Sequence, residues 1–238
     1  VVPNQIVDKE STAKKLSEIL NTNYDDMLKH LNKKTSIERI HPEGRKLSFE
    51  IADKINSLNL DGVYLLKESK RNYPYNNLLS HVLGYVGIDN QGLSGIELAY
   101  DEYLKGEDGS IKYYSDGFGK KLEKATVYNS PQSGMNVALT IDINIQQAIE
   151  NELDNVVTKY NPEQALIVVA NPKTGEIYGM SSRPNFNPNE YNKYDLETIN
   201  RNLPIFNTYE PGSTFKVISL ASSIQEKTIN LFEDKYFD

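Results

Sequence analysis

The feature that most constrains the fold is a pair of apolar segments joined by a short turn. Residues 165–170 are continuously apolar, residues 171–175 include Pro172 and Gly175, and residues 176–181 form a second run. A continuous apolar run of this length predicts a strand buried on both faces, and the Pro and Gly residues supply turn geometry. The run is far shorter than the roughly 18–20 residues that a membrane-spanning helix requires. The segment therefore predicts a buried β-hairpin.

The hairpin is flanked by predicted helices. Residues 137–141 predict a strand that leads into a helix capped by Asp142, and apolar residues continue at helical spacing to Tyr160. After the hairpin, residues 182–211 form a long loop rich in Pro and Asn, and an apolar helix begins at Ser213. Together these elements predict one side of an α/β or α+β sandwich. Long loops in compact domains are often functional.

Residues 1–137 are more polar and less regular than the rest, and we expect them to form a separate domain. The composition changes near Asn136, which places the two predicted domains at 1–137 and 138–238. Ser11 is the expected N-cap of the first helix. Helices are predicted at 12–20, 24–32, 48–56 and 96–104, and a strand at 62–66.

A hydroxyl and an amine lie three residues apart at Ser213 and Lys216, so both face the same way on a helix. A serine becomes a good nucleophile when a nearby base accepts its proton. A lysine can be that base only when its amine is neutral, which requires a low-dielectric surrounding. The N-terminal N–H groups of the helix would also face a developing oxyanion. Apolar residues predict that this helix is buried, namely Phe215, Val217, Ile218, Leu220, Ala221 and Ile224.

The S-x-x-K pattern alone does not establish catalysis, because Ser11–Lys14 also fits it. Ser213 equally fits a plain helix cap that follows a Pro-Gly turn. The apolar helix and the upstream hairpin are the context that favours a catalytic pair.

Composition excludes several classes of function. The absence of cysteine excludes thiol catalysis, thiolate metal sites and disulfides. The net charge of -7 argues against nucleic acid as a partner. His30, His41 and His81 lack the spacing of metal ligands, so we predict neither a metal nor a cofactor.

The order of several motifs resembles that of the penicillin-binding proteins. The resemblance covers about residues 40–230. It implies an α+β fold, in which an elongated, dimerisation-type pedestal domain precedes the N-terminal part of a serine-transpeptidase sandwich. The transpeptidase-like motifs are Leu139–Asp142, Ala170–Ile177, Asn185–Asn189 and Glu210–Lys216. The motifs that resemble the pedestal of class B, monofunctional members are Arg71–Pro74, Ser80–Gly87 and Gly92–Glu97.

The resemblance implies a peptidoglycan D,D-transpeptidase. Ser213 matches the acylated serine, whose backbone N–H is half of the oxyanion hole, and Lys216 matches the lysine that serves as, or assists, the base. The implied partners are peptidoglycan stem peptides, β-lactam antibiotics, a membrane-embedded glycosyltransferase and divisome-type proteins, at the extracytoplasmic face of the cell membrane. Residues 87–92 most resemble the division and sporulation subgroup, of the stage V sporulation protein D type. The Asn- and Lys-rich composition suits a low-GC Gram-positive source.

The chain also departs from the family pattern. The S-x-N and K-T-G motifs should follow the serine, so we expect an incomplete, inactive fragment that also lacks the membrane anchor and the first pedestal motif. Ser57–Asn59 and Lys173–Gly175 fit these patterns, but we assign them to turns. Two alternatives stay open: a serine β-lactamase or β-lactam sensor, and a non-catalytic cell-wall scaffolding module. Acylation by penicillin separates the scaffold from the enzymes, and the deacylation rate separates the lactamase from the transpeptidase.

Overall fold

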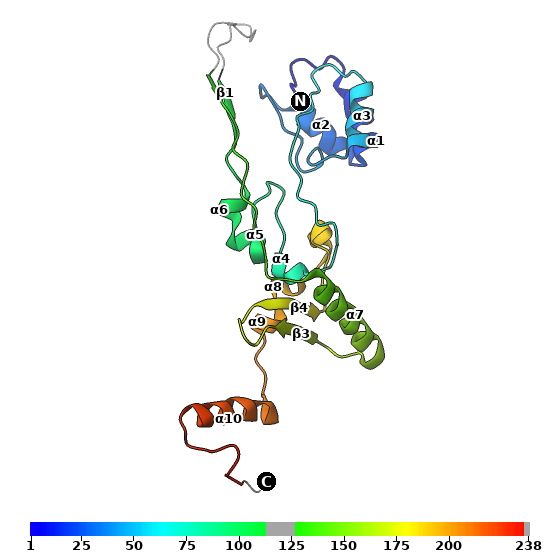
Figure 1. The fold of residues 1–238 in the computed structure, drawn as a ribbon. Helices are drawn as coiled ribbons and strands as arrows, with labels where there is room; N and C mark the ends of the chain where they lie inside the picture. The colour runs from blue at the N-terminus through cyan, green and yellow to red at the C-terminus, as the bar shows by residue number, and fades with distance from the viewer. Residues whose placement is uncertain (113–126, 236–238) are drawn as a thin grey trace.

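The computed structural model describes residues 1–112 and 127–235, and its mixed helix-and-strand architecture is elongated, as expected (Figure 1). A helical N-terminal lobe lies at one end and helix α10 at the other, with the β3–β4 hairpin between them (Figure 1). Residues 113–126 of the predicted first domain lie outside the described residues.

The N-terminal lobe contains three helices with side-chain caps: α1 (Lys9–Leu20), α2 (Tyr24–Asn32) and α3 (Phe49–Ser57). The predicted cap of α1 was wrong, because Asp8 caps it and accepts the backbone N–H of Ser11 at 2.9 Å. The apolar faces of the three helices meet in a core made of Ile6, Ala13, Leu16, Met27, Leu31 and Ile55.

Residues 62–66, predicted as a strand, form no strand in the described part of the chain, so that prediction was wrong. Their side chains still alternate, because Val63 and Leu65 pack on the helical core while Tyr64 and Leu66 are exposed. The alternation that suggested a strand therefore reflects one-sided packing on helices.

The part of the chain between the N-terminal lobe and α7, here called the central part, contains short helices and strands. The helix predicted at 96–104 is two helices, α5 (Gly95–Ala99) and α6 (Asp101–Leu104), because the backbone leaves helical geometry at Tyr100. Helix α4 (Ser80–Leu83) precedes them, and β1 (Ser110–Lys112) pairs antiparallel with β2 (Val127–Asn129).

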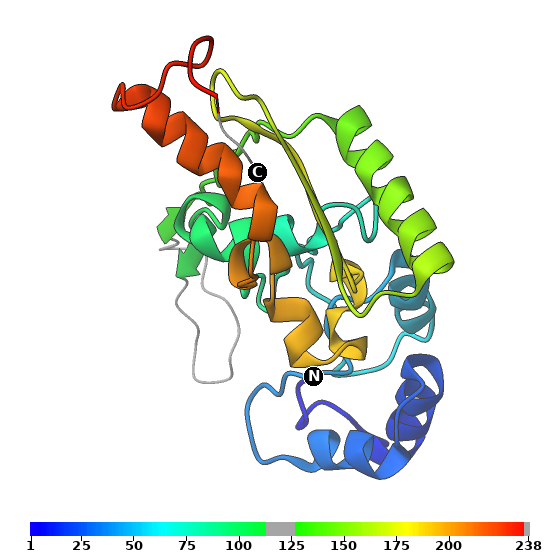
Figure 2. The same ribbon diagram turned by 90° about the horizontal axis from the view of Figure 1, so that it is seen from below.

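The predicted hairpin is present, and helix α7 (Ile143–Tyr160), capped by Asp142 as predicted, lies alongside it (Figures 1 and 2). Strand β3 (Ala165–Ala170) pairs antiparallel with β4 (Ile177–Arg183). Burial on both faces was wrong: Leu166 and Val168 are 44% and 42% exposed, because β3 is covered on one face only.

Residues 137–141 are not a strand, which corrects a further prediction. They run to the outer edge of β4, where Thr140 and Asp142 donate to the carbonyls of Ile177 and Tyr178 at 2.7 and 2.9 Å. The next backbone groups on this edge, those of Met180, bond to the buried side chain of Gln146. The start of α7 and the side chain of Gln146 thus bond to this edge of β4 in place of the expected strand.

The long loop is ordered. It contains η1 (Pro188–Lys193), α8 (Leu196–Asn200) and α9 (Leu203–Phe206), followed by η2 (Gly212–Phe215) and α10 (Lys216–Gln225). A second core joins Tyr85 of the central part to Phe186 and Ile199 of this loop. Helix α10 stands away from the hairpin (Figure 1).

Candidate active site

The turn that precedes α10 places Ser213 and Lys216. Gly212 has φ +54°, a conformation that favours glycine, and a Cβ at this position would meet nothing within 4 Å. Conformation rather than crowding therefore explains the glycine. Thr214, not Ser213, makes the local turn contact, since its hydroxyl donates to the Pro211 carbonyl at 2.5 Å. Ser213 lies in η2, a 3₁₀ helix, in which residues three apart eclipse one another, and Lys216 follows as the first residue of α10.

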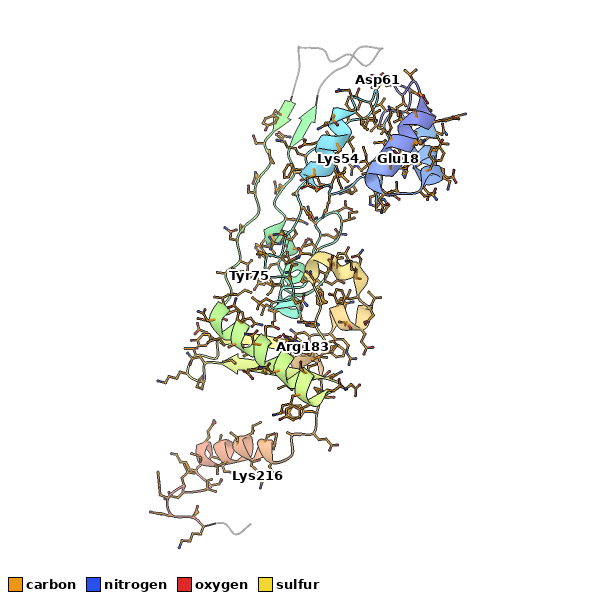
Figure 3. All side chains as sticks on the ribbon, turned by 90° about the vertical axis from the view of Figure 1, so that its right-hand side faces the viewer. Glu18, Lys54, Asp61, Tyr75, Arg183 and Lys216 are labelled. Carbon is orange, nitrogen blue, oxygen red and sulfur yellow. The ribbon has the colours of Figure 1, made fainter. Side chains whose placement is uncertain are left out.

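The predicted burial of this helix was wrong. Ser213 and Lys216 are both exposed, and α10 contains no buried residue. Within the described residues, no hydrogen bond joins the Ser213 hydroxyl to the Lys216 amine. Figure 3 shows Lys216 on the separate helix, away from Arg183 and the hairpin. The low-dielectric surrounding that a lysine base requires is absent from this arrangement.

The physical reason is that the apolar side of α10 has no partner in the described chain. Its side chains are as apolar as predicted, but they face solvent: Phe215 50%, Val217 73%, Ile218 56%, Leu220 45% and Ile224 39% exposed. The sequence pattern indicates that one side of the helix should be buried, but it does not indicate which segment buries it.

The two segments that mimic later family motifs have local structural roles. Lys173–Gly175 forms the hairpin tip, where Asn171 accepts the backbone N–H of Lys173 at 2.9 Å and Gly175 has φ +79°. Ser57 ends α3 and donates to the Lys54 carbonyl at 2.7 Å. Both segments lie far from Ser213 along the chain. Helix α3, which Ser57 ends, lies at the opposite end of the molecule from α10 (Figure 1).

The other motifs meet at the junction between the central part and the long loop, a role that sequence reasoning missed. Asn189 bonds both backbone groups of Tyr73, accepting its N–H at 3.0 Å and donating to its carbonyl at 2.8 Å. Arg71 donates to the buried Glu97 at 2.6 Å, and the Tyr73 hydroxyl donates to the same carboxylate. Burial, and then Glu97, raises the pKa of Tyr73 above its ordinary value. Clustered Asn and aromatic residues in the loop were the available signal.

His81 belongs to this junction. Its ring Nε2 donates to the Thr198 carbonyl at 2.8 Å, and its ring meets Phe186 edge-on at 5.2 Å between centroids. Burial lowers the pKa of His81, which favours the neutral ring. The histidine thus joins helix α4 to the loop.

Residues 1–112 and 127–235 contain no cluster of His, Asp and Glu that has a metal-binding arrangement. In the same described part, none of the helices combines the length and apolarity needed to cross a bilayer.

Comparison with known proteins identifies two domain families. Residues 1–139 match the penicillin-binding protein dimerisation domain, and residues 165–237 match the penicillin-binding protein transpeptidase domain.

Two relatives show how much of a longer protein is present. The chain is 50% identical over 239 residues to stage V sporulation protein D of Bacillus subtilis, a match that covers 100% of this chain and 37% of the relative. It is 31% identical over 216 residues to the peptidoglycan D,D-transpeptidase FtsI of Escherichia coli K12, covering 91% and 36%. The chain thus spans little more than a third of these relatives.

Two solved structures share the fold. Penicillin-binding protein 2X of Streptococcus thermophilus aligns with a TM-score of 0.58 and 23% identity, covering 93% of this chain and 35% of that one. A peptidoglycan synthetase from Bifidobacterium adolescentis aligns with a TM-score of 0.63 and 22% identity, covering 97% and 41%.

Proposed function

This chain belongs to the class B penicillin-binding proteins, and from that premise we propose that it carries the nucleophile of a peptidoglycan D,D-transpeptidase. The observation that carries the proposal is the segment Glu210–Lys216, which lies inside the match to the transpeptidase domain. We place the boundary between the pedestal and the transpeptidase domain at residues 137 and 138.

The proposed chemistry is acyl transfer through Ser213. Its Oγ attacks the carbonyl carbon between two D-alanines of a stem peptide, and Lys216 accepts the hydroxyl proton. The terminal D-alanine leaves as an amine that takes up a proton, and the acyl group stays on Ser213. The amine of a neighbouring strand then attacks this ester, which forms the cross-link and regenerates the hydroxyl. The backbone N–H of Ser213 supplies one donor to the oxyanion.

The finer assignments are also proposals. The identity of 50% to a protein named for sporulation supports a role in division or spore cortex synthesis. Stem peptides, β-lactams, a membrane-embedded glycosyltransferase and divisome-type proteins are the proposed partners, and the extracytoplasmic face of the cell membrane is the proposed location.

A non-catalytic scaffolding module is the second candidate, because Ser213 and Lys216 are exposed and share no hydrogen bond. A simple β-lactamase is disfavoured, since residues 1–139 match a dimerisation domain that such an enzyme does not need.

A fluorescent penicillin and mass spectrometry test the proposal. The polypeptide that continues this chain through S-x-N and K-T-G segments should form an adduct on Ser213, and Ser213→Ala should abolish it. Ser219→Ala, which changes an exposed serine on α10, is the matched control and should leave the adduct intact. The 238-residue chain alone should form none, because losing one oxyanion donor costs about 10²–10³ in rate.

Failure of the longer polypeptide to react would favour the scaffold. An adduct on Ser213 of the 238-residue chain would show that the later motifs are not required for acylation.

A further inference from the structure

The carboxylate of Glu150 joins three elements at once. It lies on α7 and is only 8% exposed. Its Oε1 accepts the backbone N–H of Leu79 at 3.0 Å and the Gln146 amide at 2.8 Å. Its Oε2 accepts a hydrogen bond from the guanidinium of Arg183 at 2.7 Å. The side chain therefore links the segment before α4, its own helix and the end of β4.

Arg183 ties β4 firmly to α7. Its two outer nitrogens donate to the side chain and the carbonyl of Glu150, and its Nε donates to Asp154 at 2.7 Å, one turn further along the helix. A guanidinium presents its donors in a rigid fork, so these bonds fix the direction of the side chain. Figure 3 shows Arg183 where β4 meets α7.

The contact with Leu79 is different, because it crosses 71 residues to the central part. Leu79 is 7% exposed and has φ +59°, a conformation that L side chains rarely adopt. Such conformations persist only where the surroundings hold them. The bond to Glu150 is the side-chain contact that holds the backbone of Leu79. Helix α4 begins at the next residue and carries His81, which binds the loop that leads to Ser213.

We propose that Glu150 is a positioning residue that sets the orientation of the central part relative to α7 and the hairpin. Gln146 and Arg183 already hold α7 against β4 without the bond to Leu79. Among the bonds that Glu150 makes, the bond to Leu79 is the one that reaches the central part. Removing one partner of a buried charged cluster leaves the others uncompensated, so the coupling should be sensitive to a small change.

The absence of cysteine allows a direct test by spin labelling. Nitroxides on Glu102→Cys and Lys159→Cys, two exposed positions on α6 and α7, report the distance between the two parts. Pulsed electron paramagnetic resonance should give a narrow distribution for the parent chain. Glu150→Gln turns one acceptor oxygen into a donor and should broaden or shift the distribution. Glu152→Gln makes the same change on the exposed face of α7 and should leave it unchanged.

Hydrogen exchange provides an independent readout at the contact itself. In Glu150→Gln, the Leu79 amide should exchange at least about tenfold faster, because a hydrogen bond to a charged acceptor contributes at least that factor. Glu150→Asp keeps the charge but withdraws it by about 1.5 Å, the length of one C–C bond, so it should have the same effect. Far-UV circular dichroism establishes that the variants keep their helices.

A folded variant whose distance distribution and Leu79 exchange equal those of the parent would overturn the proposal. Should Glu150→Gln fail to fold, Glu150→Asp decides by the same two measurements. The contacts of Glu150 exist whether or not Ser213 reacts, so a negative result here leaves the proposed acyl transfer standing.

Discussion

Truncation of Phe186 should detach the long loop from the central part. Phe186 is 0% exposed and meets His81, Tyr85 and Tyr194 with ring centroids 5.2, 5.9 and 6.1 Å apart, all close to edge-on. A buried aromatic side chain removes about 150–250 Å² from water, which at about 25 cal/mol per Å² contributes about 4–6 kcal/mol. Measured Phe→Ala changes in protein cores are about 3–5 kcal/mol. We expect Phe186→Ala to lose about 3–5 kcal/mol from the unfolding transition of this region.

The assay is urea unfolding followed by far-UV circular dichroism, since the chain has no tryptophan to serve as a probe. Hydrogen exchange at Tyr85 and Ile199, the other buried members of this core, reports the local effect. Phe49→Ala is the matched control, because Phe49 is 90% exposed and should change stability by no more than about 0.5 kcal/mol.

A loss below about 1 kcal/mol in Phe186→Ala, or a loss equal to that in the control, would refute the reasoning. It would mean that the loop is held by its polar contacts, chiefly Asn189 with the backbone of Tyr73 and His81 with Thr198. The aromatic core would then form as a consequence of the loop's position and would contribute little to holding the loop in place.

Three other predictions concern His81, Lys216 and α10. Burial holds the pKa of His81 below its ordinary value of about 6.5, so the unfolded chain binds the proton at a higher pH than the folded chain does. Stability should therefore fall as pH drops below about 6.5. Urea unfolding midpoints measured across pH 5–8 should show this loss of stability, and the loss should be smaller in His81→Gln. In the longer polypeptide, Lys216→Ala should abolish penicillin acylation while circular dichroism stays unchanged, and a near-normal rate would show that this amine is not needed. The exposed apolar side of α10 should make the 238-residue chain self-associate in sedimentation experiments; Val217→Lys should reduce association and Ser222→Lys should not.

Local patterns predicted the elements whose causes are local. Asp142 caps α7, and the Pro-Gly turn joins two strands at the expected place, because each depends on a few adjacent residues. The strands predicted at 62–66 and 137–141 were wrong, because a strand requires a ladder of backbone hydrogen bonds to a neighbour, and neither segment forms one in the described chain. Residues 62–66 pack on helices instead, and residues 137–141 end in a helix start.

The loop at 182–211 shows a different limit. Its Pro and Asn content predicted a loop, whereas the segment contains η1, α8 and α9. Its buried partners lie about a hundred residues upstream, as in the bond from Asn189 to Tyr73 with a separation of 116. Composition gives no information about such partners. Resemblance to a family marked the same residues as motifs, but it did not reveal that these motifs contact one another at the junction.

The candidate active site depends on the same non-local packing. The chemistry of Ser213 and Lys216 requires burial, while the residues that make α10 apolar are exposed in the described chain. Leu166 and Val168 leave the outer face of β3 partly uncovered too, so two apolar surfaces have no partner among the residues that the structure describes. Apolar surface of this kind favours any segment that removes it from water. In the proposed function, the segment Glu210–Lys216 provides the reacting groups and their spacing. A lysine acts as a base only in a low-dielectric surrounding, so this function requires that α10 be covered.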